Sequence, residues 1–386
     1  MKIGIVGAGI NGLCTAWALS KRGHDVTVFD QGPIPNPLSS SFDEHRIIRH
    51  AYGAMRGYAR MIPAAFAAWG RLWTDLGTSH FVAAPATYCL RMELDWYSHV
   101  SASLDEMGIA YRDIPLGDVA SALPMVNRDS LIRVVETNGS GMLLADRIVS
   151  DLARHLAAAG VTLHANTRVS AVDPERATID GWSGDAVVIA AGAWVQKLLG
   201  PISENPRATV QTVAYLEPPA SLAAAWQTAP LLLNRLPTAS GGVYILPPRQ
   251  GTRLKAGDYD HVDDGDPDAP RIPSAAQRDR VLEAASLALA DFDAYRVLEV
   301  KSCFYTVMPQ DRFVIRPLGA KAWLSSACSG HGFKFGALTG EAVADGMTGV
   351  RAAPEISMTM AGTMAGTMAG LTAPVVVPAS ETRSTA

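Results

Sequence analysis

The chain opens with apolar segments whose spacing predicts a strand, a helix and a second strand. Residues 3–6 predict a buried strand, and Leu13 and Trp17 lie on one face of the helix that follows. Gly23 ends this helix, and residues 26–29 predict the second strand. The N-terminal segment therefore predicts one βαβ unit, in which a helix connects two parallel strands.

Three glycines and one acidic residue lie at the turns of this unit. Gly7, Gly9 and Gly12 have the G-x-G-x-x-G spacing, which permits a tight turn, close approach of the backbone to a pyrophosphate, and close helix–strand contact. Asp30 follows the second strand, where a carboxylate accepts hydrogen bonds from an adenosine ribose and repels a 2′-phosphate. The unit predicts FAD or NAD rather than NADP. The glycine pattern alone leaves flavin and nicotinamide both open.

Helical spacing recurs along the chain, with strand-like runs between the helices. Residues 58–76, 147–159 and 275–289 predict helices. Residues 161–172 and 186–190 predict two further strands of the nucleotide-binding domain. The second of these strands ends in small residues, which would let the backbone pass close to a bound cofactor.

Residues 206–300 have a different pattern. Alternating positions at 210–216 and 242–246, with prolines between them, predict antiparallel strands that could form the wall of a substrate pocket. Residues 258–273, rich in Asp, Gly and Pro, predict a surface loop. We therefore expect an α/β protein with a Rossmann-like nucleotide-binding domain and a second, α+β substrate domain built on an antiparallel sheet.

The C-terminal segment, residues 351–386, loses this patterning. Met-Ala-Gly-Thr repeats lie between Met360 and Leu371, and a Pro/Val/Ser/Thr-rich end follows. This low-complexity composition predicts a disordered tail. A weakly amphipathic docking segment is the alternative.

Composition bounds the size and the partners of the protein. With 386 residues, 34 glycines and 48% hydrophobic residues, the chain can bury two cores, which predicts two domains. The formal net charge is −4, and no basic run alternates with aromatic residues. Nucleic acid is therefore not an expected partner.

Cysteine usage and hydropathy favour a cytoplasmic protein. The four cysteines have no paired metal-ligand spacing and fit a reduced protein better than a disulfide framework, so no metal site is expected. They are Cys14, Cys89, Cys303 and Cys328. The N-terminal apolar stretch is broken by glycines, unlike a secretory signal, and no run of eighteen or more apolar residues predicts a membrane span.

Three further motifs are more specific than the glycine pattern. They are RIIRHAYG at residues 46–53, CFYTVMPQDRFVI at 303–315 and SGHGFKFG at 329–336. In this order behind a dinucleotide fold, the chain resembles the monomeric sarcosine oxidase and N-methyltryptophan oxidase branch of the D-amino acid oxidase (DAO) superfamily of flavoproteins. The resemblance spans about residues 1–350.

The resemblance implies a DAO/glutathione-reductase-type fold and a monomer. It assigns residues 1–82, 142–207 and 308–350 to a discontinuous FAD-binding domain. Residues 83–141 and 208–307 would form the substrate domain.

The resemblance also implies how the cofactor is held. Cys303 matches the cysteine whose sulfur bonds to the 8α carbon of FAD, although a small buried apolar cysteine is the usual alternative for this residue type. A thioether would prevent cofactor dissociation and is expected to raise the flavin potential. Arg46 matches the arginine that packs against the flavin. Further cofactor contacts are expected from Val169, Gly330, Gly332, Phe333 and Lys334.

For the substrate, the resemblance implies a pair of cations. Arg49 and Lys334 match the residues that hold the substrate carboxylate, a role suited to a guanidinium fork and a nearby ammonium. Lys255 matches the residue that promotes reaction with O2, where a fixed positive charge stabilises developing superoxide. Tyr244 and Tyr305 match aromatic residues of the substrate pocket.

Three positions depart from the family pattern. Phe42 and Tyr259 replace two histidines of the sarcosine-oxidising members, which predicts a less basic, more aromatic pocket and a larger or cyclic substrate. Arg316 stands where an acidic residue is common.

These features predict oxidation of a carboxylate-bearing secondary amine by hydride transfer to flavin N5, hydrolysis of the imine and reduction of O2 to H2O2. Three alternatives remain. They are a flavin dehydrogenase or pathway-specific oxidase with another electron acceptor, an NAD-dependent dehydrogenase, and a flavin-holding binding protein without turnover. Sarcosine, other N-methyl amino acids, cyclic imino acids such as pipecolate or proline, and a pathway-specific intermediate all remain candidate substrates.

Overall fold

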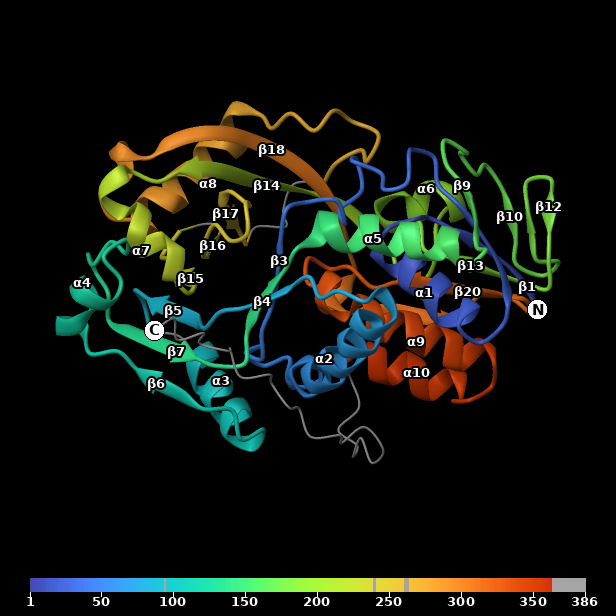
Figure 1. The fold of residues 1–386 in the computed structure, drawn as a ribbon, viewed down its shortest axis with the longest axis horizontal. Coiled ribbons are helices and arrows are strands. Elements are labelled where there is room, and N and C mark those ends of the chain that lie inside the picture. The colour runs from blue at the N-terminus through green and yellow to red at the C-terminus, as the bar shows by residue number, and fades with distance from the viewer. Residues whose placement is uncertain (94, 239–240, 260–263, 363–386) are drawn as a thin grey trace, which may run out of the picture.

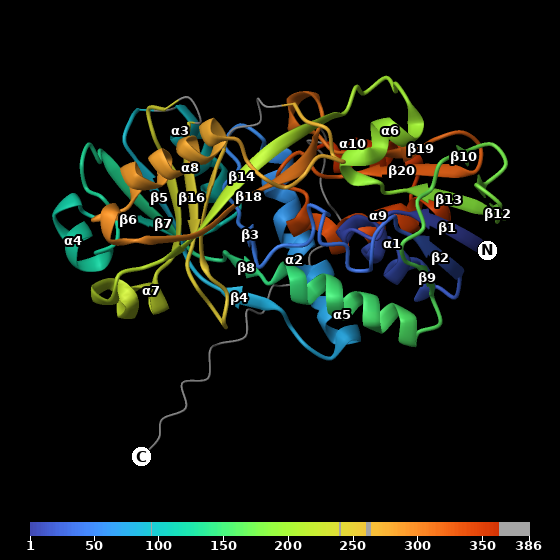
Figure 2. The same cartoon turned by 90° about the horizontal axis from the view of Figure 1, so that it is seen from above.

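Two large β-sheets form the two halves of the molecule. The computed structural model describes residues 1–93, 95–238, 241–259 and 264–362. Figure 1 shows an elongated molecule with one sheet toward each end and with the N-terminus at the end farther from the eight-stranded sheet. Figure 2 shows the same division from above. The predicted combination of an α/β half with an antiparallel half is confirmed.

The first sheet has six strands and contains the predicted βαβ unit. In sheet order they are β19 (Val314–Pro317), β20 (Ala322–Ser326), β13 (Ala186–Ile189), β1 (Lys2–Val6), β2 (Asp25–Phe29) and β9 (Thr162–His164). Strand β1 pairs in parallel with both β2 and β13, and only β19 runs antiparallel to its neighbour. The central strands are buried along almost their whole length, as expected for a sheet covered on both faces.

Helices cover this sheet and pack closely on one another. They include α1 (Ile10–Ser20), α2 (Arg56–Leu76), α5 (Ala145–Ala158), α6 (Val195–Leu199) and α9 (Gly336–Met347). Helices α1 and α9 cross so closely that a Cβ atom on Gly340 would lie 2.3 Å from the carbonyl oxygen of Cys14. This contact ties the first glycine motif to the segment after the last one.

The second sheet has eight strands. In sheet order they are β18 (Arg296–Val307), β14 (Arg207–Glu217), β17 (Leu254–Asp258), β16 (Gly242–Leu246), β15 (Leu231–Arg235), β5 (Ala86–Leu90), β7 (Arg133–Thr137) and β6 (Tyr111–Asp113). Every pair is antiparallel except β15 with β5. The helices of this half are α3 (Asp95–Glu106), α4 (Val119–Ala122), α7 (Ala223–Thr228) and α8 (Ala275–Ala288).

The alternation along β16 decides which face of this sheet meets the other half. Val243 and Ile245 pack into the hydrophobic cluster that includes α8. Tyr244 and Leu246 point to the opposite face, because successive side chains of a strand alternate. Leu246 pairs with Lys255 across the ladder, so Lys255 lies on this second face as well.

The remaining strands of the described residues form two small sheets. One contains β3 (Arg46–Ile48), β8 (Gly141–Leu143) and β4 (Phe81–Ala83), and it lies between the two halves in both views (Figures 1 and 2). The other contains β10 (Val172–Asp173), β11 (Thr178–Ile179) and β12 (Trp182–Ser183). The domain boundaries stay a prediction.

The helices predicted at 58–76, 147–159 and 275–289 are confirmed as α2, α5 and α8, within two residues at each end. The single strand predicted at 161–172 is wrong. Only β9 joins the nucleotide sheet, and the chain then turns at Asn166, which has a positive φ of 53°, before β10 begins in a separate small sheet. The loop predicted at 258–273 contains residues 260–263, which lie outside the described residues.

The disorder predicted from residue 351 is wrong for the start of that segment. Ala353–Met360 form helix α10, which packs on β19 and α9. Ile356 and Met360 are buried, and the hydroxyl of Ser357 donates a 2.7 Å hydrogen bond to the carbonyl oxygen of Ile315. This part of the segment docks, as the alternative reading proposed, and residues 363–386 lie outside the described residues. Among the described helices, none is long and apolar enough to span a membrane.

Candidate functional site

A cavity of about 740 Å³ lies between the two sheets and receives residues from both. Its volume falls within the range of about 300–1,000 Å³ that is typical of small-molecule and cofactor sites. All of the site residues proposed from the sequence line it, apart from Gly12 and Cys303. These lining residues are Gly7, Gly9, Asp30, Arg46, Arg49, Val169, Tyr244, Lys255, Tyr259, Tyr305, Gly330, Gly332, Phe333 and Lys334.

Glycine residues shape the nucleotide end of the cavity, because they have no Cβ atom to fill it. Gly7 has a φ of +105°, and a Cβ atom there would lie 2.3 Å from the carbonyl oxygen of Ala190. A Cβ atom on Gly12 would lie 1.8 Å from the carbonyl oxygen of Gly7. Gly12 therefore supports the turn from behind, while Gly7 and Gly9 face the cavity. These are the tight turn and the helix–strand contact that the glycine spacing predicts.

Asp30 closes the same end at the carboxyl end of β2. Its side chain accepts hydrogen bonds from the backbone N–H groups of Ala8 (2.8 Å) and Gly32 (2.9 Å), and from Asn36 Nδ2 (2.8 Å). Three donors fix the carboxylate in place, and carboxylates can accept further bonds. The position suits recognition of a ribose hydroxyl.

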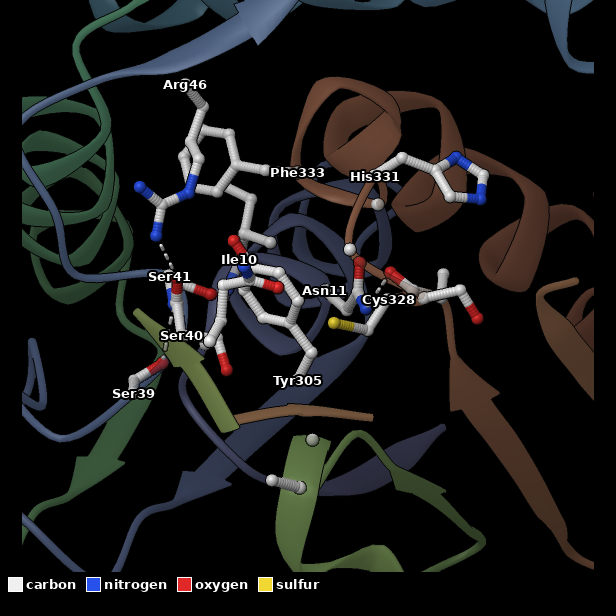
Figure 3. Close-up of a pocket in the computed structure, with 18 of the residues that line it drawn as sticks. Ile10, Asn11, Ser39, Ser40, Ser41, Arg46, Tyr305, Cys328, His331 and Phe333 are labelled. Atoms are coloured by element: carbon white, nitrogen blue, oxygen red, sulfur yellow. Dashed lines mark hydrogen bonds between the residues drawn. The ribbon is translucent and has the colours of Figure 1, made fainter. Parts of the chain in front are cut away.

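A serine-rich segment at residues 39–41 lies beside the start of α1 and was not singled out in the sequence. The backbone N–H of Ile10, the first residue of α1, donates a 2.9 Å hydrogen bond to Ser41 Oγ. Figure 3 shows the guanidinium of Arg46 turned toward this segment, and its Nη2 donates a 2.7 Å hydrogen bond to the carbonyl oxygen of Ser40. A helix N-terminus with polar neighbours is a suitable place for a diphosphate.

The third motif forms the opposite wall of the cavity. A Cβ atom on Gly332 would lie 1.8 Å from the carbonyl oxygen of Ala327, and Gly330 has a φ of +70°. The indole N–H of Trp69 on α2 donates a 2.7 Å hydrogen bond to the carbonyl oxygen of Lys334. Asn11 Nδ2 also donates to Ala327, at 3.1 Å, on the side where Figure 3 places Cys328. These contacts hold a backbone that requires glycine at position 332.

Arg49 and Lys334 lie over one aromatic ring. Arg49 Cζ is 5.4 Å and Lys334 Nζ is 5.3 Å from the ring centroid of Tyr52. Lys334 is buried, and its ammonium donates a 3.1 Å hydrogen bond to the carbonyl oxygen of His331. Nη1 of Arg49 is buried and has no hydrogen-bond partner within the described ranges. The two cations are therefore neighbours on the cavity wall.

The charges of Arg49 and Lys334 would be stabilised by a bound anion. Burial and the neighbouring charge of Arg49 hold the pKa of the Lys334 ammonium well below its ordinary value. Burial also disfavours the charged form of Arg49, but the nearby hydroxyls, Tyr88 first among them, leave its pKa raised. The ion pairs formed by the described residues include neither cation. A buried positive pair of this kind is stabilised by a carboxylate.

The second face of the eight-stranded sheet supplies the remaining wall. Tyr305 on β18, Tyr244 on β16 and Lys255 on β17 all point to this face and line the cavity. Tyr259 follows β17, with its ring 5.9 Å from that of Tyr244 and with the guanidinium of Arg235 4.7 Å away. The sequence pattern indicated the three tyrosines but not Arg235, which carries no motif around it.

Lys255 is fully buried and is paired with a carboxylate that the sequence analysis missed. Its Nζ donates hydrogen bonds to Asp43 Oδ2 (2.6 Å) and to the carbonyl oxygen of His45 (3.0 Å). Asp43 also forms an ion pair with Arg46. The only signal in the sequence was an acidic residue three positions before Arg46, which is unremarkable in a serine-rich segment.

Cys303 lies on the cavity face of β18, two residues before Tyr305, but it is not among the lining residues. Its sulfur lies close enough to the Arg46–Asp43–Lys255 group to share their electrostatic field, and burial raises the pKa of its thiol. Cys328 does line the cavity. Cys303 lies on the same face of β18 as Tyr305, and its covalent bond to FAD stays a prediction.

The departures from the family pattern have different positions. Tyr259 lines the cavity, whereas Phe42 does not and instead packs against the core of the nucleotide half. Arg316 on β19 forms an ion pair with Glu204, with Nε 2.5 Å from Oε1. This pair lies apart from the cavity, so the substitution at 316 has a structural partner and no place in the site.

The residues fit FAD. A glycine turn, a serine-flanked helix start and a fixed carboxylate line one end of the cavity, and a glycine-bent backbone with aromatic and cationic side chains lines the other. Backbone N–H groups and cations near a flavin ring stabilise its reduced, anionic form. Among the described residues, no group of three or more His, Cys, Asp or Glu side chains could hold a metal ion.

Comparison with known sequences identifies relatives over most of the chain. Mouse (Mus musculus) peroxisomal sarcosine oxidase is 26% identical over 354 residues, covering 87% of this chain and 89% of that protein. N-methyl-L-tryptophan oxidase of Yersinia pestis (strain Pestoides F) is 27% identical over 357 residues, covering 88% and 93%.

Solved structures with the same fold include NikD, described as an unusual amino acid oxidase essential for nikkomycin biosynthesis, with a TM-score of 0.77 at 21% identity and coverage of 91% of this chain and 95% of that one. The L-proline dehydrogenase of P. horikoshii matches with a TM-score of 0.77 at 17% identity, covering 92% and 95%. The family model for DAO, FAD-dependent oxidoreductase, matches residues 2–346. The chain therefore belongs to the DAO family of FAD-dependent oxidoreductases.

Proposed function

We propose that this protein is an FAD-dependent oxidase of a secondary amino acid, either N-methylated or cyclic. The amine is oxidised to an imine, water hydrolyses the imine, and O2 is reduced to H2O2. The observation that carries the proposal is the pair formed by Arg49, which is half-buried, and Lys334, which is buried. The pair lines the cavity and has no carboxylate partner among the described residues.

The cation pair would bind the substrate through its carboxylate. The guanidinium of Arg49 can donate two parallel hydrogen bonds to a planar carboxylate, and the Lys334 ammonium adds a compact positive charge. Tyr52 lies beneath both groups and limits how far either can move. A substrate held at its carboxylate has the reacting carbon in a restricted position, and such orientation accelerates the chemical step.

The same charges would favour the neutral form of the substrate amine. Positive groups close to an amine lower its pKa, because they disfavour a second positive charge nearby. A neutral amine can release hydride, whereas an ammonium cannot easily do so. When bound, FAD supplies the hydride acceptor, N5 of its ring, and the electrons for O2. No side-chain base is required in this scheme.

The wall formed by the eight-stranded sheet would serve the oxidative half of the reaction. Lys255 presents a buried ammonium at the cavity, where a fixed positive charge stabilises superoxide as the first electron reaches O2. Tyr244, Tyr305 and Tyr259 would enclose the apolar part of the substrate. The aromatic Tyr259 and the nearby guanidinium of Arg235 favour a substrate larger than sarcosine.

The relatives support this reaction class but span a range of substrate sizes. One is named for sarcosine and another for N-methyl-L-tryptophan, and both names denote N-methylated amino acids. The shared features, a carboxylate and a secondary amine, are those that the cation pair and the neutral-amine requirement demand. We also propose a monomeric, cytoplasmic protein, which gel filtration and cell fractionation test.

The proposal is tested with a panel of amines under anaerobic conditions. Bleaching of the flavin absorbance by an N-methyl or cyclic amino acid, but not by the same amine without its carboxylate, is the expected result. Admitting air should then restore the colour within seconds and produce H2O2 equal to the substrate consumed. Absence of bleaching by every amino and imino acid contradicts the proposal. Bleaching that persists in air for minutes favours the dehydrogenase alternative, with another electron acceptor.

Covalent attachment of FAD at Cys303 is a further part of the proposal. Acid precipitation of the wild-type protein is expected to give a yellow pellet, because a thioether survives denaturation. Cys303→Ala should give a colourless pellet and a yellow supernatant. Cys328→Ala is the matched control, since Cys328 lines the cavity but does not match the family position. A pellet that stays yellow in Cys303→Ala and loses colour in Cys328→Ala would place the bond at Cys328 and contradict the proposed attachment at Cys303.

A further inference from the structure

The carboxylate of Asp43 contacts several cations next to the cavity wall that carries Lys255. Asp43 has a side chain only 4% exposed, and its carboxylate contacts three cations and one phenol. We call this group the Asp43 cluster. Its members are Asp43, Arg46, Tyr215, Lys255 and Lys301.

The contacts within the Asp43 cluster divide between the two carboxylate oxygens. Oδ2 accepts from Lys255 Nζ at 2.6 Å and also pairs with Arg46. Oδ1 accepts from the hydroxyl of Tyr215 and lies 3.8 Å from Lys301 Nζ. Burial alone would raise the pKa of Asp43, but the three cations, Arg46 first among them, hold it well below its usual range. The carboxylate is therefore charged at every pH at which the protein would be assayed.

Asp43 stands behind the wall and not in it. Lys255 and Arg46 line the cavity, whereas Asp43, Tyr215 and Lys301 do not. The carboxylate therefore reaches the reacting groups only through the cations that it holds. A substrate or O2 in the cavity would meet the ammonium of Lys255 first.

The protonation of the Lys255 ammonium depends on the negative charge of Asp43. Burial lowers its pKa to about 8, while the Asp43 carboxylate acts in the opposite direction and Arg46 lowers it further. The ring of His45 is buried beside it, and burial together with Lys255 holds the pKa of that imidazole well below its ordinary value, so the ring is neutral. The charged and titratable groups facing Lys255 are Asp43, His45 and Arg46 from the segment entering β3, Tyr215 from β14, Tyr244 from β16, and Lys301 and Cys303 from β18.

We propose that Asp43 is a positioning residue for the oxidative half-reaction: it fixes the ammonium of Lys255 at the cavity wall and keeps it protonated. This inference rests on the proposed oxidase function. The overall reaction is unchanged: O2 would take up two electrons and one proton from the anionic reduced FAD and a second proton from solvent, and leave as H2O2, while Lys255 retains its proton. Asp43 contributes only by supplying the negative charge that makes a buried ammonium stable.

Substitution of the carboxylate by an amide separates charge from shape. Asp43→Asn keeps an oxygen that can accept from Lys255, but it removes the negative charge. An opposite charge at this distance shifts a pKa by about 1–3 units, so the Lys255 ammonium should lose its proton at a correspondingly lower pH. In the wild type, the rate of reoxidation by O2 is expected to fall as the pH rises through about 8, because Lys255 then becomes neutral.

Stopped-flow reoxidation of reduced enzyme between pH 6 and pH 9 tests this inference. Asp43→Asn is expected to reoxidise about 10- to 100-fold more slowly than wild type at pH 8, and to recover as the pH falls toward 6. Reduction by substrate should change little. Asp75→Asn is the control, since Asp75 pairs with Lys21 (2.5 Å) and Trp17 (2.9 Å) away from the cavity. A reoxidation midpoint that does not move in Asp43→Asn overturns the inference.

Two further measurements separate positioning from a merely structural role. At pH 6 the flavin midpoint potential of Asp43→Asn should be more positive than that of wild type, because the cluster has gained a net positive charge. Tyr215→Phe removes the hydroxyl that donates to Asp43 Oδ1, so the carboxylate interacts more strongly with Lys255. The pH midpoint of reoxidation should therefore move to a higher pH. If the Asp43→Asn protein does not fold stably, the pH midpoint of reoxidation in Tyr215→Phe decides the question. An unchanged pH midpoint in Tyr215→Phe then overturns the inference.

The outcome for Lys255 itself keeps the two proposals distinguishable. If Lys255→Met reoxidises as fast as wild type, the proposed role of Lys255 in the oxidase fails. If Lys255→Met is slow at every pH while Asp43→Asn behaves as wild type, only the inference about Asp43 fails. Recovery at low pH in Asp43→Asn, without recovery in Lys255→Met, supports both.

Discussion

Replacing Lys334 by Met is expected to lower kcat/KM for the amino-acid substrate by about 100- to 1,000-fold. This corresponds to about 3–4 kcal/mol, within the range found when one partner of a buried charge pair is truncated. Met has a similar length and no charge, so the cavity keeps its shape while the carboxylate loses one of its two cations. The rate of flavin bleaching against substrate concentration, measured by anaerobic stopped flow, gives the value.

The matched control for this variant is Lys321→Met, because Lys321 is exposed and lies outside the cavity. Its kinetics should equal those of wild type. Lys334→Met should also bleach no more slowly with a decarboxylated amine than wild type does, since neither enzyme then has a carboxylate to bind. Unchanged kcat/KM for the amino acid in Lys334→Met would remove the main support for the proposed function.

Lys255→Met is expected to slow reoxidation by O2 by about 100- to 1,000-fold, the usual effect of removing one group that stabilises developing negative charge. Reduction by substrate should stay within a few-fold of wild type, because Arg49 and Lys334, and not Lys255, would hold the substrate carboxylate. Stopped-flow mixing of reduced enzyme with aerated buffer measures the first rate, and anaerobic mixing with substrate measures the second. Equal losses in both half-reactions would indicate a general disturbance of the cavity.

Thermal unfolding separates these effects from loss of structure. Lys255 is paired with Asp43, so Lys255→Met leaves a buried carboxylate that still contacts Arg46 and Lys301. The remaining cations should limit the change in melting temperature. The effect on reoxidation is then assigned to the missing ammonium. Lys321→Met again provides the exposed control.

Much of the candidate site was accessible from sequence because its residues lie in short, ordered motifs. Arg46 begins the short strand β3 and Arg49 follows its last residue, and Lys334 lies two residues after the second glycine of the third motif. The two-residue period of a strand places Cys303 and Tyr305 on one face. Once such a motif is assigned to an element, the face on which its side chains lie follows from backbone geometry alone.

The parts that were missed depend on contacts between distant segments. Asp43 gains its importance from Lys255, which is 212 positions away in the chain, and from Tyr215, 172 positions away. Neither separation leaves a local pattern. The serines at 39–41 likewise became part of the site only because the loop folds back on the start of α1. Phe42, placed in the pocket by its resemblance to the family pattern, is partly buried and packs against the core of the nucleotide half instead.

Two errors in the fold prediction have the same cause. Composition predicted disorder after residue 351, yet α10 forms because Ile356 and Met360 find an apolar surface on β19 and α9. Local alternation favoured one long strand at 161–172, yet only β9 finds a neighbouring strand in the nucleotide sheet. In both cases the partner surface, which a local pattern does not contain, decided the outcome.

The amino-acid sequence by itself determined the nucleotide-binding unit, the order of the motifs and the chemical types that line the cavity, because these depend on local geometry and on the period of each element. The tertiary structure decided which charges meet. Only the packing of the second sheet against the nucleotide half put Lys255 beside Asp43. The same packing left Arg49 and Lys334 beside each other with no acidic partner among the residues that the structure describes. The reason is physical: the stability of a buried charge depends on its neighbours in space, and those neighbours come from segments that the chain brings together only when it folds.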